Sequence, residues 1–300
     1  MIAALFPGQN SQVVGMARNL YDGSAAARRV LDEAEAALPG LLETMWRGPE
    51  DALKLTATQQ PALVAAAAAA FAAYLEAGGA RPAYLAGHSL GEFSAHVAAG
   101  SLALTEAVAL VHRRGRYMQE AVPAGRGAMA AVLKTDRAHT ERVCAETAGI
   151  VEVANFNAPE QTVISGESEA VAAAGERLEA EGARVVTLNV SAPFHCSLMR
   201  PAALKLARDL RRVQFSTPQF PIICNVTADV LGDVREVPEL LERQVTAPVR
   251  WVETLERLHR SGVTRTVEFG SGKVLSGLVK RTLGVPAVAV TDMKTLEEAL

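Results

Sequence analysis

The sequence predicts an α/β protein in which a smaller unit is inserted into a larger one. Short apolar runs typical of buried strands alternate with helical patterns over most of the 300 residues, which indicates a parallel sheet with helices on both faces. Between Gly125 and Ser191 the order changes to strand, helix, two strands, helix and strand, the ferredoxin-like arrangement. We therefore assign residues 125–192 to a small subdomain, and residues 1–124 and 193–300 to a large one.

The elements of the large subdomain follow from apolar runs and their boundaries. Ile2 to Phe6 is a compact apolar run that ends at Pro7-Gly8, which is typical of a buried strand that leads into a loop. A second apolar run at residues 83–86 precedes Gly87 and predicts a second strand. Further strands are expected over 221–225 and 263–269, and helices over 61–77, 92–99, 105–122, 198–212 and 274–283.

The inserted segment is expected to form six elements. Strands are predicted over 128–133, 151–155, 162–165 and 184–190, and helices over 136–148 and 168–181. A unit of this size can bury a core of its own, so we expect a compact subdomain rather than a long loop.

Composition excludes several classes of function. Lys and Arg number 30 against 33 Asp and Glu, so there is no basic excess to indicate a nucleic-acid partner. The most apolar stretch, residues 61–75, is too short to span a membrane, and the first ten residues lack the pattern of a signal peptide. Cys144, Cys196 and Cys224 are widely spaced and show no metal-ligand pattern, which fits a reducing compartment. We expect a cytoplasmic protein with no metal, membrane or nucleic-acid partner.

Ser89 is the candidate nucleophile. It lies in Gly87-His88-Ser89-Leu90-Gly91, directly after a predicted strand and directly before a predicted helix. A serine at such a sharp turn has its hydroxyl raised above the sheet, and flanking glycines allow the strained backbone. The same pattern also arises by chance in a chain rich in Gly and Ala, so the pentapeptide alone does not establish a catalytic serine, and other residues are needed to support it.

A serine nucleophile needs a base, and the sequence contains six histidines. Three lie among charged residues on helical patterns and are expected to face solvent: His112, His139 and His259. His96 is expected in the core, and His88 is held at the turn with poor geometry for a base. His195 follows the last strand of the insertion, where the two subdomains must meet, and we expect it to be the base.

An ordinary esterase would carry an acid between the serine and the histidine in chain order. The acidic residues from Asp136 to Glu181 belong to the insertion, and Glu106 and Glu120 lie on a helix, so no such acid is apparent. This weakens the esterase interpretation. A group other than a carboxylate, for example a backbone carbonyl or an amide side chain, would then orient His195.

Arg114 is expected to project from the apolar face of its helix, because Leu110, Val111 and Met118 share that face. A guanidinium in that position must find an anion or several acceptors, since desolvating its charge alone is costly. Two interpretations follow: a buried salt bridge to a protein carboxylate, or a fork that binds the carboxylate of a substrate.

Nine motifs, in order along nearly the whole chain, resemble those of the malonyl-CoA:acyl carrier protein transacylases and of the acyltransferase domains of polyketide synthases. They are LFPGQNSQ (5–12), TQQPAL (58–63), GHSLGEFSA (87–95), RRGRYMQEAVP (113–123), ANFNAPEQTVISG (154–166), VSAPFHC (190–196), NVTA (225–228), QVTAPVRW (244–251) and EFGSGKVLSGLVKR (268–281).

The resemblance implies an α/β-hydrolase-like large subdomain with a ferredoxin-like insertion, and a ping-pong transfer that serves fatty acid biosynthesis. Ser89 would attack the malonyl thioester of malonyl-CoA, and the phosphopantetheine thiol of acyl carrier protein would then take the malonyl group from the serine ester. Both thioesters are substrates, so no cofactor is expected. We expect the enzyme to act as a monomer.

The resemblance also implies a role for each site residue. His195 would be the base, the carbonyl of Gln244 would orient it, and the backbone N–H groups of Gln9 and Leu90 would form the oxyanion hole. Arg114 would grip the malonyl carboxylate, and the bulk of Phe194 would leave little room for an α-methyl branch.

Two positions depart from the family pattern. Asn10 stands where glycine is usual, and asparagine tolerates a left-handed backbone better than most residues. Ser271 stands where proline is common, so we expect that loop to be less rigid.

Other functions fit parts of the pattern. One alternative is a separate acyltransferase, or an acyl hydrolase, that serves a polyketide synthase. A non-enzymatic scaffold is a third class, and the presence of Ser89, His195 and Arg114 together argues against it.

Overall fold

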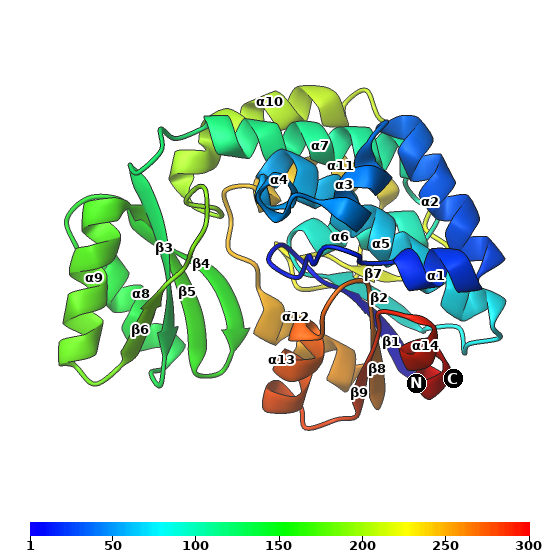
Figure 1. Cartoon of the computed structure of the whole chain (residues 1–300). Helices are drawn as coiled ribbons and strands as arrows, with labels where there is room; N and C mark the ends of the chain where they lie inside the picture. Colours follow the sequence, from blue (N-terminus) through cyan, green and yellow to red (C-terminus); the bar gives the residue numbers. More distant parts are fainter.

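The computed structural model describes all 300 residues and contains two β-sheets (Figure 1). The larger sheet has five parallel strands in the order β7-β2-β1-β8-β9. These strands are β1 (Ile2–Phe6), β2 (Tyr84–Gly87), β7 (Ile222–Ile223), β8 (Arg265–Phe269) and β9 (Ala287–Val290). The expected α/β architecture is therefore present, with one strand, β9, that the sequence analysis did not assign.

Alternate residues of the central strand β1 enter two different cores. Ala4 and Phe6 belong to the main core, which is formed with the helices on one face of the sheet, whereas Ala3 and Leu5 pack in a second core with α12 (Trp251–Arg260) and α13 (Val274–Thr282). The parallel sheet is thus buried on both faces, as its uninterrupted apolar strands require.

The other helices of the large subdomain are α1 (Arg18–Gly23), α2 (Ala25–Ala37), α3 (Leu41–Arg47), α4 (Glu50–Lys54), α5 (Thr56–Glu76), α6 (Leu90–Ala98), α7 (Leu104–Glu120), α10 (Arg200–Leu210), α11 (Val237–Gln244) and α14 (Met293–Ala299), with short 3₁₀ helices η1 (Ser197–Met199) and η2 (Val234–Glu236).

Helix α5 begins at Thr56, five residues before the expected start, so Pro61 lies inside it. A proline has no N–H, so the carbonyl of Ala57, four residues earlier, loses its helical partner. His112 Nδ1 lies 2.9 Å from that carbonyl oxygen and supplies the missing hydrogen bond. The expectation that His112 faces solvent was therefore wrong: it is half-buried and joins α7 to α5.

The smaller sheet has four antiparallel strands in the order β4-β5-β3-β6. Its elements are β3 (Gly127–Leu133), α8 (Arg137–Glu146), β4 (Val151–Ala158), β5 (Gln161–Glu167), α9 (Ser168–Ala180) and β6 (Arg184–Thr187), the ferredoxin-like succession. All of them lie within 125–192, and we propose these bounds for a subdomain inserted between 1–124 and 193–300.

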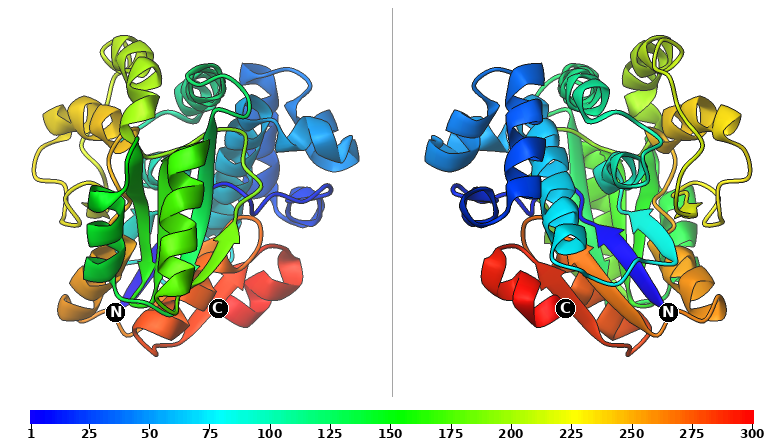
Figure 2. Two further views of the ribbon diagram at one scale, coloured as in Figure 1. Left: turned by 90° about the vertical axis from the view of Figure 1, so that its left-hand side faces the viewer. Right: turned by 90° about the vertical axis from the view of Figure 1, so that its right-hand side faces the viewer.

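Figure 2 shows α8 and α9 covering the outer face of the small sheet, so its other face is turned toward the large subdomain. Ala130, Val132 and Ile164 pack under these helices, whereas Met129 and Val163 point the other way and line a cleft between the subdomains. The alternation of strand residues thus gives the small sheet one face for its own core and one for the cleft.

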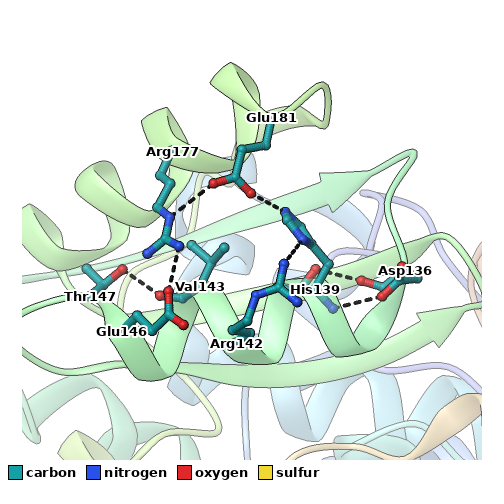
Figure 3. A network of polar contacts seen from close by, with 9 residues as sticks. Asp136, His139, Arg142, Val143, Glu146, Thr147, Arg177 and Glu181 are labelled. Atoms are coloured by element: carbon teal, nitrogen blue, oxygen red, sulfur yellow. Dashed lines mark hydrogen bonds and ion pairs between the residues drawn. The ribbon is translucent and has the colours of Figure 1, made fainter.

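Polar contacts join α8 to α9 on the outer surface of the small subdomain (Figure 3). Glu181 accepts from His139 at 2.6 Å and from Arg177 at 3.1 Å, and Arg177 also bonds Glu146 at 2.5 Å. His139 was expected to face solvent, but only 19% of its side chain is exposed because these neighbours surround it. His259 is exposed and His96 is buried, as expected.

None of the helices combines the length and the apolar character needed to cross a membrane.

Gly115 on α7 sets the distance between α7 and α5, and this predicts a large effect of a single methyl group. A Cβ at Gly115 would lie 2.4 Å from the carbonyl oxygen of Thr56, whereas one at Gly277, within α13, would meet nothing within 4 Å. We expect Gly115→Ala to lower the free energy of unfolding by about 1–3 kcal/mol. Gly277→Ala should raise it by up to about 1 kcal/mol. Urea denaturation of both variants checks this, and equal effects would contradict the packing argument.

Candidate active site

Ser89 occupies a strained turn between β2 and α6. Its φ is 51° and its ψ is −106°, a left-handed conformation that is rare for a residue with a side chain. A Cβ at Gly91 would lie 2.0 Å from the carbonyl oxygen of Phe6, so only glycine fits there. Asn225 holds the turn: its Oδ1 accepts from Ser89 N–H at 2.7 Å and its Nδ2 donates to Gly87 O at 2.6 Å. The fold therefore fixes the serine in the geometry of a nucleophile elbow.

His195 meets Ser89 from the loop that follows the small subdomain. The Oγ of Ser89 lies 2.7 Å from Nε2 of His195, and Nδ1 lies 2.9 Å from Gln244 O and 3.2 Å from Ala247 O. Both carbonyls can only accept, so Nδ1 carries the proton and Nε2 is free to accept from the serine hydroxyl. Burial, together with the charge of Arg114, lowers the pKa of His195 to about 3, so the ring is neutral at ordinary pH.

Arg114 lies on α7, is fully buried and contacts Ser89. Its guanidinium donates to Gln60 Oε1 at 2.9 Å, to Gln244 Oε1 at 3.0 Å and to Ser89 Oγ at 3.3 Å, and its Nε–H has no partner. The site thus holds a buried cation whose Nη2 contacts Ser89 and whose Nε–H is unpaired. Burial lowers the pKa of Arg114 to about 10, which leaves it protonated at neutral pH.

The salt bridge that was one of the two interpretations of Arg114 is not found. Ion pairs between basic and acidic side chains occur at many positions in the chain, but none involves Arg114. Its partners are two neutral amides and the serine hydroxyl. The interpretation of Arg114 as a partner in a buried salt bridge is therefore wrong.

The side chain of Gln244 connects several parts of the site. Its Nε2 donates to Ser89 O at 3.0 Å and to Glu92 Oε2 at 2.7 Å, while its Oε1 accepts from Arg114. Glu92 also accepts from Asn225 N–H at 3.1 Å. Burial raises the pKa of Glu92 from 4.5 to about 7. The folded state therefore binds a proton that the unfolded chain releases, so this carboxyl lowers stability as the pH rises from about 4.5 through 7.

A cleft of about 290 Å³ opens above Ser89, between the two subdomains. Gln9, Asn10 and Phe194 line it, together with residues of β3 and β5. The backbone N–H groups of Gln9 and Leu90 donate to no other backbone group, so both are available to an oxygen of a ligand.

The two departures from the family pattern have local explanations. Asn10 takes a φ of 68°, the left-handed conformation that asparagine tolerates. The hydroxyl of Ser271 donates to Ser11 O at 2.5 Å, so this side chain ties its loop to the loop that carries Gln9. The expected loss of rigidity at Ser271 is offset by this hydrogen bond.

The structure brings Ser89, His195, Gln244 and Arg114 into direct hydrogen-bond contact, with Phe194, Gln9 and Leu90 around them. It adds three polar residues to which the sequence analysis gave no role: Gln60, Glu92 and Asn225. All three lie within motifs that carried the family resemblance. The motifs mark the segments, but only the fold shows which side chain each residue bonds.

Several known proteins are similar to this chain over its full length. The family model described as "Acyl transferase domain" matches residues 4–296. The chain is 44% identical over 305 residues to the malonyl CoA-acyl carrier protein transacylase of Bacillus subtilis (strain 168), covering 100% of this chain and 96% of that protein. It is 42% identical to the protein of the same name from Escherichia coli (strain K12), covering 99% and 98%.

Solved structures match over the full length as well. One is a malonyl-transacylase in complex with a type II polyketide synthase acyl-carrier protein, with a TM-score of 0.97, 43% identity, and coverage of 100% of this chain and 98% of that chain. Another is an acyl carrier protein S-malonyltransferase from Vibrio cholerae O1, with a TM-score of 0.97, 41% identity, and coverage of 100% and 99%.

The lowered pKa of His195 predicts how the reactivity of Ser89 depends on pH. A fluorophosphonate probe that labels activated serines should react with Ser89 at nearly the same rate at pH 5 and pH 8, because the base is unprotonated at both. A histidine with the ordinary pKa of about 6.5 would slow the reaction about 30-fold at pH 5. Labelling followed by mass spectrometry measures the rate, with Ser89→Ala as the blank. A 30-fold loss would show that His195 titrates normally.

Proposed function

The chain belongs to the acyl transferase domain family, and to the malonyl-CoA:acyl carrier protein transacylases within it, and on this basis we propose that it transfers a malonyl group from malonyl-CoA to the phosphopantetheine thiol of acyl carrier protein. The reaction is an acyl transfer through a serine ester and serves fatty acid biosynthesis. The observation that carries the proposal is the contact between the Ser89 hydroxyl, the free Nε2 of His195 and the guanidinium of Arg114.

In the first half-reaction Ser89 becomes malonylated. His195 Nε2 takes the hydroxyl proton as Oγ attacks the thioester carbonyl of malonyl-CoA. The carbonyls of Gln244 and Ala247 accept from Nδ1–H and stabilise the imidazolium that forms. When the tetrahedral intermediate collapses, the C–S bond breaks, and the CoA sulfur leaves with the proton that His195 returns.

The second half-reaction is the same chemistry in reverse. The phosphopantetheine thiol of the carrier protein gives its proton to His195, and its sulfur attacks the carbonyl of the malonyl-serine ester. The ester C–O bond breaks, and Ser89 Oγ recovers its proton from His195. In both halves the carbonyl oxygen gains negative charge, and the N–H groups of Gln9 and Leu90, which donate to no other backbone group, would donate hydrogen bonds to it.

Arg114 gives the site its preference for a dicarboxylic acyl group. Its guanidinium already contacts Ser89 Oγ at 3.3 Å, so the carboxylate of a malonyl group carried on that oxygen lies within its reach. Its Nε–H is unpaired, its other donors bond only neutral groups, and in this buried setting a charge-assisted hydrogen bond to a carboxylate would be strong. Phe194, next to His195, narrows the cleft where an α-methyl branch would lie.

A second candidate function differs only in the pathway. One similar structure shows a malonyl-transacylase with a type II polyketide synthase acyl-carrier protein, so transfer to such a carrier is the alternative that an observation favours. An acyl hydrolase would use the same serine ester and differ only in letting water attack it, so the fate of the malonyl group distinguishes it from a transferase. The expectations of a monomer, of a cytoplasmic location and of no cofactor stay predictions.

Malonylation of Ser89 is the direct test of the proposed function. After mixing with malonyl-CoA, the intact protein should gain the mass of one malonyl group, and added carrier protein should remove it and become malonylated. Ser89→Ala should acquire no adduct. An adduct that decays to free malonate while the carrier stays unmodified would contradict the transferase and indicate a hydrolase.

Arg114→Ala should change the preference of the enzyme for its acyl group. We expect the kcat/KM for malonyl transfer to fall about 10- to 150-fold, because a charge-assisted hydrogen bond contributes about 1.5–3 kcal/mol, while acetyl transfer is unchanged or faster. Arg116→Ala, on the exposed side of the same helix, is the matched control and should change neither rate. Equal losses for malonyl and acetyl in Arg114→Ala would refute the carboxylate role.

A further inference from the structure

Glu92 is a buried carboxylate beside the site that no step of the mechanism uses. It lies in the first turn of α6, three residues after the nucleophile, and its side chain is 1% exposed. Its Oε2 accepts from the side chain of Gln244 at 2.7 Å and from the backbone of Asn225 at 3.1 Å. Both donors come from segments other than its own helix, and both residues also bond the elbow around Ser89.

The contact with Glu92 is one of three that fix which way the Gln244 amide points. Nε2 faces two acceptors, Glu92 Oε2 and Ser89 O, while Oε1 faces a donor, the guanidinium of Arg114. If the amide were turned over, its oxygen would face two acceptors and its NH₂ group would face the guanidinium. The arrangement therefore has one satisfied orientation, and Glu92 supplies the shorter of the two hydrogen bonds that select it.

The amide stands between two buried charges. It donates to the carboxylate of Glu92 and accepts from the guanidinium of Arg114. Glu92 and Arg114 form no direct ion pair, so the amide is the bridge between them. The bridge holds Arg114 by one edge and leaves its Nε–H free. A direct salt bridge to Glu92 would instead occupy the donors that a substrate carboxylate needs.

A comparison with Glu268 separates this role from an ordinary structural one. Glu268 is also 1% exposed, but it accepts from Leu275 N–H, Ser276 N–H and the Ser276 hydroxyl, all at the start of α13. That pattern caps a helix N-terminus. Glu92 caps nothing: its partners are a side chain and a loop N–H that belong to the site. Burial raises the pKa of both carboxyls, so the two differ in their hydrogen-bond partners and not in the direction of this shift.

We propose that Glu92 is a positioning residue for acyl-group selection: by fixing the Gln244 amide, it holds the Arg114 guanidinium in place for the carboxylate of the acyl group. The inference rests on the proposed function, because it assigns Glu92 to the choice between malonyl and acetyl groups.

The test compares two substitutions of Glu92. Glu92→Gln keeps an oxygen that accepts from Gln244 and Asn225, whereas Glu92→Leu keeps the volume and removes the acceptor. We measure kcat/KM for malonyl and for acetyl transfer in each, with wild type and Arg114→Ala beside them. The malonyl-to-acetyl ratio should fall about 10-fold or more in Glu92→Leu, as expected when a hydrogen bond that positions a charged group is lost. Glu92→Gln should keep the wild-type ratio.

The wild-type and Glu92→Leu results together distinguish a failure of the proposed role of Glu92 from a failure of the proposed function. If wild type transfers no malonyl group, the proposed function fails; if wild type prefers malonyl but Glu92→Leu prefers it equally, the inference fails alone. A merely structural role would lower both rates together and leave the ratio unchanged. If Glu92→Leu does not fold, Glu92→Asp withdraws the carboxylate from Gln244 by one methylene group and should lower the ratio as well. An unchanged ratio in Glu92→Asp would then overturn the proposal.

Discussion

The site depends on Gln244, whose main chain and side chain each hold a different residue beside Ser89. Its main-chain carbonyl orients His195, and its side-chain amide holds Arg114, so one residue at the end of α11 fixes both the base and the cation around Ser89. The segment that follows it pairs with the small sheet, since Val249 bonds the backbone of Ala154 and of Phe156, each at 2.9 Å. The placement of the small subdomain and the geometry of the site are therefore linked through residues 244–249.

Burial gives each ionisable group of the site the state that the chemistry needs. His195 is neutral because desolvation lowers its pKa to about 3, whereas Arg114 keeps its proton although burial lowers its pKa to about 10. Burial raises the pKa of Glu92 to about 7, so this carboxyl is only partly ionised at neutral pH, and it bonds the Gln244 amide rather than Arg114. The extensive core around α5, in contact with both β8 and β9, supplies the stability that offsets these desolvated groups.

Much of the fold and part of the site could be predicted from the sequence, and the reason differs by residue. Ser89 and Arg114 were predicted from local patterns, a strand-turn-helix pentapeptide and an arginine on an apolar stripe, and such patterns lie within one element. Glu92 was not predicted, because its partners are more than 130 residues away and no local pattern marks them. His112 was placed in solvent because its acceptor is a carbonyl that Pro61 frees on another helix. The strand predicted over 184–190 ends at Thr187, because Leu188 and Val190 turn into the cleft.

In the proposed reaction the malonyl group on Ser89 places its carboxylate against Arg114 while Gln244 keeps its orientation. The most direct measurement is a crystal structure of the malonyl-enzyme, trapped without carrier protein. We expect a carboxylate oxygen within about 3 Å of the guanidinium and the ester carbonyl directed at the N–H groups of Gln9 and Leu90. A carboxylate that points out into the cleft, with Arg114 still bonded only to Gln60, Gln244 and Ser89, would contradict this expectation.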